Sequence, residues 1–447
     1  MSDRYDLVVA GGVCVTPGGR VEADVGIRAG RIAAIGRIDP GHAAERFDAR
    51  GLHVLPGVID SQVHFREPGL EHKEDLATGS AAAVKGGITA VFEMPNTDPN
   101  TDSAAALADK LARARGRMWC DHAFFVGATA ENADELGRLE RHPGCAGVKM
   151  FMGSSTGTLL VADDPTVARV LASGTRRIAV HAEDESRLNE RRKLFAGGAR
   201  VGMHPVWRDS EVAVRATTRL LRLAWEAGRR VHVLHVSTED ETALLQEARD
   251  IATFEITPQH LTLAAPECYD RLGTFAQMNP PIREARHRDG LWRAVASGLC
   301  DVIGSDHAPH TREEKAQPYP NSPSGMPGVQ TLLPVMLDHV AAGRLTLERL
   351  VDLVCHGPAR IYNVVGKGRL TPGYDADLTI VDLAARRTIA NDWIASRAGW
   401  TPFDGMTVTG WPRATIVRGH VVMRDDELVG TPQGAPVRFA ECLRGAP

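Results

Sequence analysis

The residues that could perform chemistry first appear in residues 57–69, where an apolar run ends in polar residues and a Pro-Gly pair. This pattern predicts a buried strand that delivers side chains into a loop. Residues two apart in a strand share a face, so Gln62 and His64 point the same way, and Arg66 follows as the strand ends. The spacing is suited to holding a metal ion beside an anion.

Further donors end other apolar runs: His181, His235 and Asp306. Together with His64 they are nitrogen and oxygen donors of the kind that borderline divalent metals select, and no thiolate competes, so zinc is the natural metal. A lone histidine is more often a surface or core residue, but four donors at the ends of separate strands form a set. A carboxylate after an apolar strand is costly unless it meets a metal or a hydrogen-bond donor, which leaves a purely structural Asp306 as the alternative.

Two histidines lie on one predicted strand, His232 and His235. They are three residues apart and therefore face opposite sides of the strand, so only one can point into the site. We predict that it is His235, which lies nearer the carboxyl end. His232 is predicted to be structural.

Lys149 also lies on an apolar run. An ammonium group has three donors and no lone pair, so Lys149 cannot bind a metal in that form. One alternative is a lysine held by an ion pair or reaching toward solvent. Burial beside cations would instead favour its neutral, reactive amine by lowering its pKa.

Eight apolar runs alternate with amphipathic helical patterns, which is typical of βα units around a parallel sheet. The runs cover residues 58–64, 88–94, 123–126, 147–152, 177–181, 231–236, 252–256 and 301–306. Helices are predicted over residues 75–85, 103–115, 211–226, 239–249 and 346–355. The pattern predicts a (β/α)8 barrel, whose active site is formed at the carboxyl ends of the strands, where the candidate ligands lie.

The two ends of the chain have a different pattern of short strands and tight turns. Strands are predicted over residues 6–10, 13–16, 24–27 and 31–35, and again over 378–382, 407–409, 414–419 and 421–423. Neither set is large enough to bury its own core, so we predict that they pair in one small β-sandwich domain. The predicted boundaries are 1–53 and 366–447 for this domain and 54–365 for the barrel.

Composition excludes several other classes of protein. The chain has 447 residues, 43% of them hydrophobic, and a formal net charge of -4, with no basic stripe for nucleic acid. No apolar run is long enough to span a membrane, and the first residues lack a signal-peptide pattern, so we expect a cytoplasmic protein. The seven cysteines are scattered without a Cys-x-x-Cys pair, which argues against disulfides and a thiolate zinc site.

Six short motifs run in order along nearly the whole chain. They are His64-Phe-Arg-Glu-Pro-Gly69, Gly147-Val-Lys149, Val180-His-Ala-Glu183, His235-Val-Ser-Thr238, Asn279-Pro-Pro281 and Asp306-His-Ala-Pro-His310. Together they resemble the dihydroorotase branch of the amidohydrolase superfamily. The resemblance implies a barrel joined to a small β-domain, and reversible, zinc-dependent hydrolysis of the cyclic amide of dihydroorotate to N-carbamoyl-aspartate in pyrimidine synthesis.

The resemblance also implies roles for individual residues. Lys149 would react with carbon dioxide to give a carbamate that bridges two metals. Asp306 would bind one zinc ion and carry the proton of the attacking water to the departing amide nitrogen.

Arg66 would bind the substrate carboxylate through its planar fork, assisted by a set of amides and an imidazole: Asn96, Asn279 and His310. Asn96 and Asn279 precede turn-like residues, so simple turn formation is the alternative for both. The loop over residues 311–328, after the last barrel strand, could cover the site.

One position departs from the resemblance: the family places His-x-His where this chain has Gln62-x-His64. An amide oxygen is a weaker zinc ligand than an imidazole, so the metal nearest the first strand should be loosely held and the chain should bind one or two zinc ions. Alternatively, Gln62 turns away toward a neighbouring strand.

Two other functions stay open. A hydantoinase or allantoinase would act on another cyclic ureide, although the arginine after the first-strand histidine favours a dihydroorotase. An inactive relative would serve as a scaffold for aspartate transcarbamoylase, which only Gln62 supports. The expected partners are a small-molecule substrate and a second copy of the chain in a homodimer, with aspartate transcarbamoylase as a further partner to test.

Overall fold

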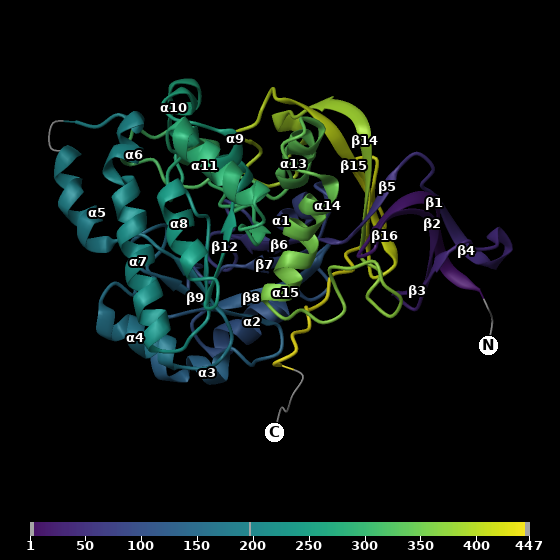
Figure 1. Ribbon diagram of the computed structural model, residues 1–447, viewed down its shortest axis with the longest axis horizontal. Helices are drawn as coiled ribbons and strands as arrows, with labels where there is room; N and C mark the ends of the chain where they lie inside the picture. Colours follow the sequence, from purple (N-terminus) through teal and green to yellow (C-terminus); the bar gives the residue numbers. More distant parts are fainter. Residues whose placement is uncertain (1–3, 196–197, 443–447) are drawn as a thin grey trace.

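The predicted barrel is present in the computed structural model, which describes residues 4–195 and 198–442. Eight parallel strands follow one another in sequence order around it. They are β6 (Val58–Val63), β7 (Ile88–Glu93), β8 (Asp121–Gly127), β9 (Cys145–Phe151), β10 (Ile178–His181), β11 (Val231–Val233), β12 (Ala252–Ile256) and β13 (Val302–Ile303). Figure 1 labels β6, β7, β8, β9 and β12 of this barrel. The ring closes where Val63 bridges to His307 and the His64 N–H donates to the His307 carbonyl at 2.7 Å.

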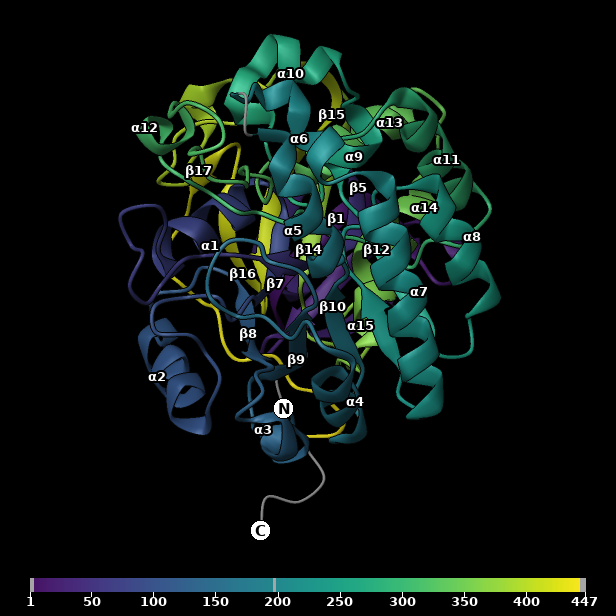
Figure 2. The same ribbon diagram turned by 90° about the vertical axis from the view of Figure 1, so that its left-hand side faces the viewer.

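Helices cover the outside of these strands (Figure 2). Five correspond to the predicted ones: α1 (Leu76–Lys85), α2 (Ala104–Ala114), α7 (Ser210–Glu226), α8 (Glu239–Glu247) and α14 (Leu347–Val351). Each begins after a side chain that caps its free N–H groups, as Asp75 does for Thr78 at 2.8 Å. The last is shorter than predicted because the chain widens into a π-helical turn over Asp352–His356.

The other helices lie between and after the barrel strands. They are α3 (Leu136–Leu139), α4 (Asp164–Ala172), α5 (Glu185–Arg191), α6 (His204–Trp207), α9 (Pro258–Thr262), α10 (Glu267–Leu272), α11 (Ala285–Ala296), α12 (Arg312–Lys315), α13 (Leu332–Ala341) and α15 (Gly357–Ile361). None of the helices in the described part of the chain combines the length and apolar character that a membrane span requires.

Both ends of the chain contribute to a second sheet, as predicted. Its strands are β1 (Tyr5–Thr16), β2 (Gly19–Arg28), β3 (Arg31–Gly36), β4 (Ala43–Asp48), β5 (His53–Pro56), β14 (Leu378–Thr388), β15 (Thr407–Val417), β16 (His420–Arg424) and β17 (Glu427–Leu428). The two ends meet where β5 pairs with β1 on one side and β14 on the other. The exact domain boundaries stay a prediction.

Two predicted breaks between strands are wrong. Residues 407–409 and 414–417 lie in the single strand β15. Residues 6–10 and 13–16 belong to a single strand, β1, and Gly11 and Gly12 form an irregularity in its pairing with β2. Gly11 adopts a φ of 71° and donates its N–H to Asp24 at 2.8 Å, so the chain bulges and continues instead of reversing.

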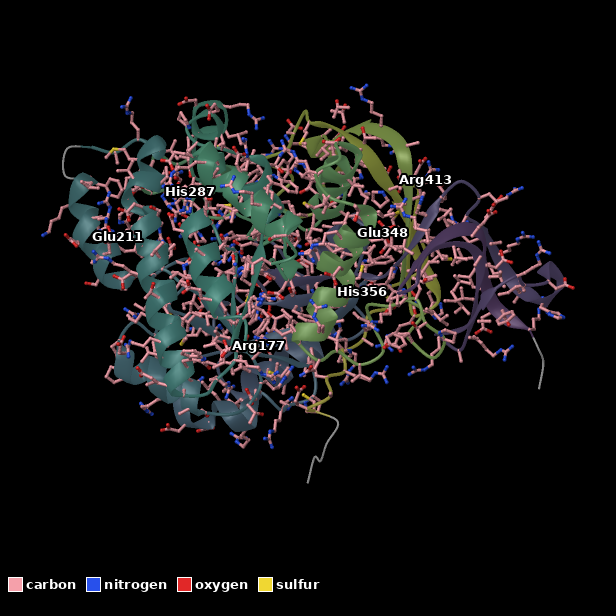
Figure 3. All side chains as sticks on the ribbon, in the orientation of Figure 1. Arg177, Glu211, His287, Glu348, His356 and Arg413 are labelled. Atoms are coloured by element: carbon pink, nitrogen blue, oxygen red, sulfur yellow. The ribbon has the colours of Figure 1, made fainter. Side chains whose placement is uncertain are left out.

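Ion pairs join the barrel to this sheet. Glu348 of α14, labelled in Figure 3, accepts from Arg20 of β2 at 2.5 Å. In the interior, the Lys367 ammonium contacts Asp121 of β8, Asp377 and Asp375. These three buried carboxylates are close enough together to hold a metal ion, but Lys367 already supplies the compensating charge, so we assign them a structural role.

Candidate active site at the carboxyl ends of the barrel strands

A cavity lies at the carboxyl ends of the barrel strands. Every predicted site residue except His310 lines it: Gln62, His64, Arg66, Asn96, Lys149, His181, His235, Asn279 and Asp306. Residues of the long loops also contribute, namely Ser155, Thr156, Ser324 and Gly325. The structure thus brings together residues that are spread over more than half of the chain.

The backbone turns sharply where three of these residues leave their strands. Arg66, His235 and Asp306 have φ values of 64°, 40° and 45°. Non-glycine residues rarely adopt this left-handed region, and each such residue costs on the order of 1–3 kcal/mol that the surrounding structure must offset. Such residues cluster at functional sites, and here the turns aim all three side chains at the cavity.

His181 and His235 form one half of a candidate metal site. The His181 Nδ1 atom lies 3.0 Å from His235 Nε2, while the His181 Nε2–H donates to Glu183 at 2.9 Å. Because Glu183 accepts this proton, His181 Nδ1 carries a lone pair. Two nitrogens bound to one tetrahedral zinc ion lie about 3.3 Å apart, so the pair fits a zinc ion.

Glu183 was not among the predicted site residues. It is fully buried and contacts Arg208. Burial alone would raise the pKa of Glu183, but Arg208 and His181 outweigh it and lower the pKa to about 2. The signal was present in the sequence, since Glu183 lies two residues after His181, just beyond the end of β10. A carboxylate on the second ring nitrogen orients a metal-binding histidine and increases its basicity.

Gln62, His64 and Asp306 form the other half. The Gln62 amide donates to Asp306 Oδ1 at 3.0 Å, and His64 Nε2 lies 3.3 Å from the same oxygen. The Gln62 side chain lines the cavity and so does not turn away from it, although its amide does bond to a residue after the neighbouring strand β13. Gln62 Oε1 is buried and has no hydrogen-bond partner among the described residues, so a cation would satisfy it.

Replacing Gln62 by histidine should raise the zinc retained after dialysis from about one to about two ions per chain. The imidazole is the stronger ligand, and Asp306 and His64 are already in place beside it. Metal analysis of the dialysed proteins checks this, with Gln62→Leu as a control that fills the space without a donor and should gain no zinc. If the unchanged protein keeps two zinc ions through dialysis against a chelator, Gln62 does not weaken the site.

His232 lies away from the cavity, as predicted. Its ring nitrogens face Thr253 at 2.9 Å and Glu255 at 3.3 Å, both on β12. His232 therefore bonds to the neighbouring barrel strand, which agrees with a structural role.

Lys149 is 1% exposed, and its Nζ lies 4.4 Å from the ring centroid of Phe151. Among the described residues Lys149 has no ion pair with a carboxylate, and Asp306 and Glu255 act on it only through longer-range charge, which argues against the salt-bridged alternative. Burial lowers the pKa of Lys149, and the more distant carboxylates of Asp306 and Glu255 oppose this shift. The surroundings therefore favour the neutral amine more than water does.

Arg66 provides the cationic wall of the cavity. It is 1% exposed, and its Nε donates to the Pro309 carbonyl at 3.1 Å. Burial lowers the pKa of Arg66 to about 10, so the group stays charged at neutral pH. Its Nη1 atom is buried and has no hydrogen-bond partner in the described residues. An anion in the cavity would satisfy it.

His310 lies behind Arg66 and does not line the cavity, so the structure does not place it against a substrate. Its Nδ1 accepts from the Lys73 ammonium at 3.2 Å, and its Nε2–H donates to the Ser324 carbonyl at 3.0 Å. Arg66 Nη2 lies 3.3 Å from the same His310 Nε2 atom. Because both nitrogens then carry protons, the two groups touch without forming a hydrogen bond. Nothing in the sequence pattern singled out Lys73.

The two predicted asparagines have more specific partners than turn formers would. Asn279 Oδ1 faces His204 Nε2 at 3.0 Å, and its amide donates to Ser155 at 3.3 Å. Asn96 Oδ1 lies 2.7 Å from His64 Nδ1. Asn279 is thus held as part of the cavity wall, whereas Asn96 contacts a candidate metal ligand.

A (β/α)8 barrel with imidazoles, a carboxylate and a buried lysine at the carboxyl ends of its strands has the architecture of the barrel hydrolases that generally depend on metal ions. The chain belongs to the amidohydrolase family, whose model matches residues 53–422.

Individual relatives carry several names. The chain is 37% identical to a dihydroorotase of Halobacterium salinarum, covering 94% of this chain and 97% of that protein. It is also 37% identical to an allantoinase of Solibacter usitatus, covering 95% of this chain and 94% of that protein. Among solved structures, an L-hydantoinase (dihydropyrimidinase) from Arthrobacter aurescens superimposes with a TM-score of 0.91 at 33% identity, covering 97% of this chain and 99% of that one. The family is therefore shown, while its members differ in substrate.

Proposed function

We propose that this protein is a zinc-dependent dihydroorotase, which interconverts dihydroorotate and N-carbamoyl-aspartate in pyrimidine synthesis. The observation that carries the proposal is Arg66, a buried cation that lines the cavity and whose Nη1 donor has no hydrogen-bond partner among the described residues. Dihydroorotate has a carboxylate that would accept a hydrogen bond from this donor, whereas hydantoin and allantoin have no carboxylate. The dihydroorotases among the relatives support the same substrate.

The cavity provides separate places for the two ends of such a substrate. The carboxylate would lie against Arg66, and Asn279 would border the ring. The ring amide would then face the donors around Asp306. A bound zinc ion supplies a Lewis acid that polarises the amide carbonyl and lowers the pKa of water.

In this proposal Asp306 moves the proton. Its Oδ1 accepts from Gln62, and burial raises the pKa of its carboxyl group. A carboxylate of raised basicity would accept a proton from the attacking water and donate it to the departing amide nitrogen, which becomes the NH2 of the carbamoyl group of N-carbamoyl-aspartate. The reverse sequence closes the ring.

We propose that Lys149 carries a carbamate in the active protein. Its neutral amine would form a bond to the carbon of carbon dioxide and release one proton, which converts the neutral amine into an anion with two oxygens that could bind metal. The burial of Lys149 among metal-ligand candidates supports this.

A hydantoinase or allantoinase is the second candidate, which the 0.91 TM-score to an L-hydantoinase and the 37% identity to an allantoinase favour. These enzymes hydrolyse other cyclic ureides, so the same metal chemistry would serve. An inactive scaffold has less support, because His64, Lys149, His181, His235 and Asp306 all line the cavity.

Arg66→Lys should weaken dihydroorotate binding by about 10-fold or more while leaving bound metal unchanged. Lysine keeps the charge but loses the planar fork, and charged hydrogen bonds contribute about 1.5–3 kcal/mol. Steady-state kinetics with dihydroorotate and metal analysis check this. Turnover of hydantoin, where it is detected, serves as the control. Hydantoin has no carboxylate, so its kinetics should not change in Arg66→Lys. Unchanged kinetics with dihydroorotate would remove Arg66 from substrate binding.

A further inference from the structure

Asn96 contacts a candidate metal ligand, although the sequence analysis predicts that it binds substrate. It lies after β7, is 5% exposed, and lines the cavity next to His64. We propose that Asn96 is a positioning residue, which fixes the tautomer and orientation of His64 for the metal nearest the first strand. This inference rests on the proposed function, because it concerns the same metal site.

The orientation of the Asn96 amide follows from its second contact. Asn96 Nδ2 lies 2.8 Å from the Thr156 carbonyl oxygen, which can only accept a hydrogen bond. The nitrogen of the amide must therefore face Thr156. The oxygen is left to face His64 Nδ1, at 2.7 Å.

An oxygen acceptor at this position determines where His64 carries its proton. The short contact is favourable only if His64 Nδ1 is protonated and donates to Asn96. In a neutral imidazole, the lone pair is then on Nε2, the atom that lies 3.3 Å from Asp306 Oδ1. Asn96 thus presents to a metal the His64 nitrogen that faces the other ligands.

Glu183 makes the same kind of contact on the other half of the site. It accepts from His181 Nε2 at 2.9 Å and leaves Nδ1 free to face His235. The two halves differ in charge, because Glu183 is a carboxylate and Asn96 a neutral amide. A neutral acceptor increases ligand basicity less, which adds to the weakness that Gln62 already gives the first-strand metal.

Asn96 is itself held by the loops above the cavity. Thr156, in the loop after β9, donates from its hydroxyl to the Ser324 carbonyl at 3.1 Å, and the same carbonyl accepts from His310. A chain of contacts therefore runs from His64 through Asn96 and Thr156 to the loop that packs around Arg66. The orientation of the ligand depends on the same loops that form the cavity wall.

Zinc titration of the metal-free protein against a chromophoric chelator distinguishes this role from substrate binding. In Asn96→Ala, we expect the affinity for the more weakly bound zinc to fall roughly 10–100-fold, with the tighter zinc unchanged, as for other partners of metal-binding histidines. The shorter serine side chain of Asn96→Ser cannot reach His64, so this variant should bind zinc as Asn96→Ala does. Asn96→Asp keeps an acceptor oxygen for His64 but loses the donor to the Thr156 carbonyl, so it should retain more of the affinity than Asn96→Ala does.

Asn279→Ala is the matched control, since it removes a cavity amide that does not contact a metal ligand, and both zinc affinities should stay unchanged. Thermal unfolding of the metal-free variants shows whether they fold. The inference is overturned if folded Asn96→Ala or Asn96→Ser binds both zinc ions as the parent does and only KM for dihydroorotate rises. A parent protein that binds no zinc contradicts the proposed function itself.

Discussion

Asp306→Asn is expected to lower kcat for dihydroorotate by about 10²–10⁴-fold, the usual contribution of a positioned acid or base. The asparagine amide can neither accept the proton of the attacking water nor bind zinc as a carboxylate. Asp306 is 6% exposed, so bulk water cannot readily replace it. Steady-state kinetics in both directions of the reaction measure the effect.

Asparagine is the substitution that removes the carboxylate of Asp306 with the least change in shape. Asp306 has a φ of 45°, a region that asparagine tolerates better than most residues, so the turn should be kept. The Gln62 amide could still donate to the new side-chain oxygen. Thermal unfolding of the metal-free proteins should therefore be similar, and activity within a factor of ten of the parent would exclude Asp306 as the proton carrier.

Lys149→Ala is expected to lose bound metal and activity together. If a carbamate on Lys149 holds both metals, removing the side chain removes ligands from each half of the site. Short carboxylic acids should partly restore metal and activity, because they fit the space vacated and supply two oxygens. Metal analysis and kinetics with and without added acetate or propionate check this.

Lys149→Met provides the matched control. Methionine fills much of the space of the lysine, so it should lose metal as the alanine variant does but should not respond to added acids. Intact mass or a crystal structure of the metal-loaded parent gives an independent reading. A free, unmodified amine in that protein would contradict the carbamate.

The sequence was most informative where hydrophobic periodicity and strand geometry decide the structure. The eight apolar runs became the eight barrel strands, and the rule that residues two apart share a face correctly placed Gln62 beside His64. Helix starts were also accurate, because capping side chains such as Asp75 and Thr238 mark them. Gly11 and Gly12 were misread because a bulge and a turn use the same residues.

The sequence was least informative about contacts between side chains on different loops. Asn96 and His310 were assigned to substrate by motif, but one contacts His64 and the other lies behind Arg66. Both contacts depend on how the loops that carry Thr156 and Ser324 fold over the strand ends. Spacing along one strand carries no information about such partners.

The measurement that tests the account most directly is kcat/KM of the purified, zinc-loaded protein for dihydroorotate, hydantoin and allantoin. We predict that dihydroorotate is hydrolysed to N-carbamoyl-aspartate with a kcat/KM at least about 10-fold above that of the other two, because only its carboxylate satisfies Arg66. A higher kcat/KM for hydantoin or allantoin, or no turnover of dihydroorotate by protein that holds zinc, would contradict the proposed function.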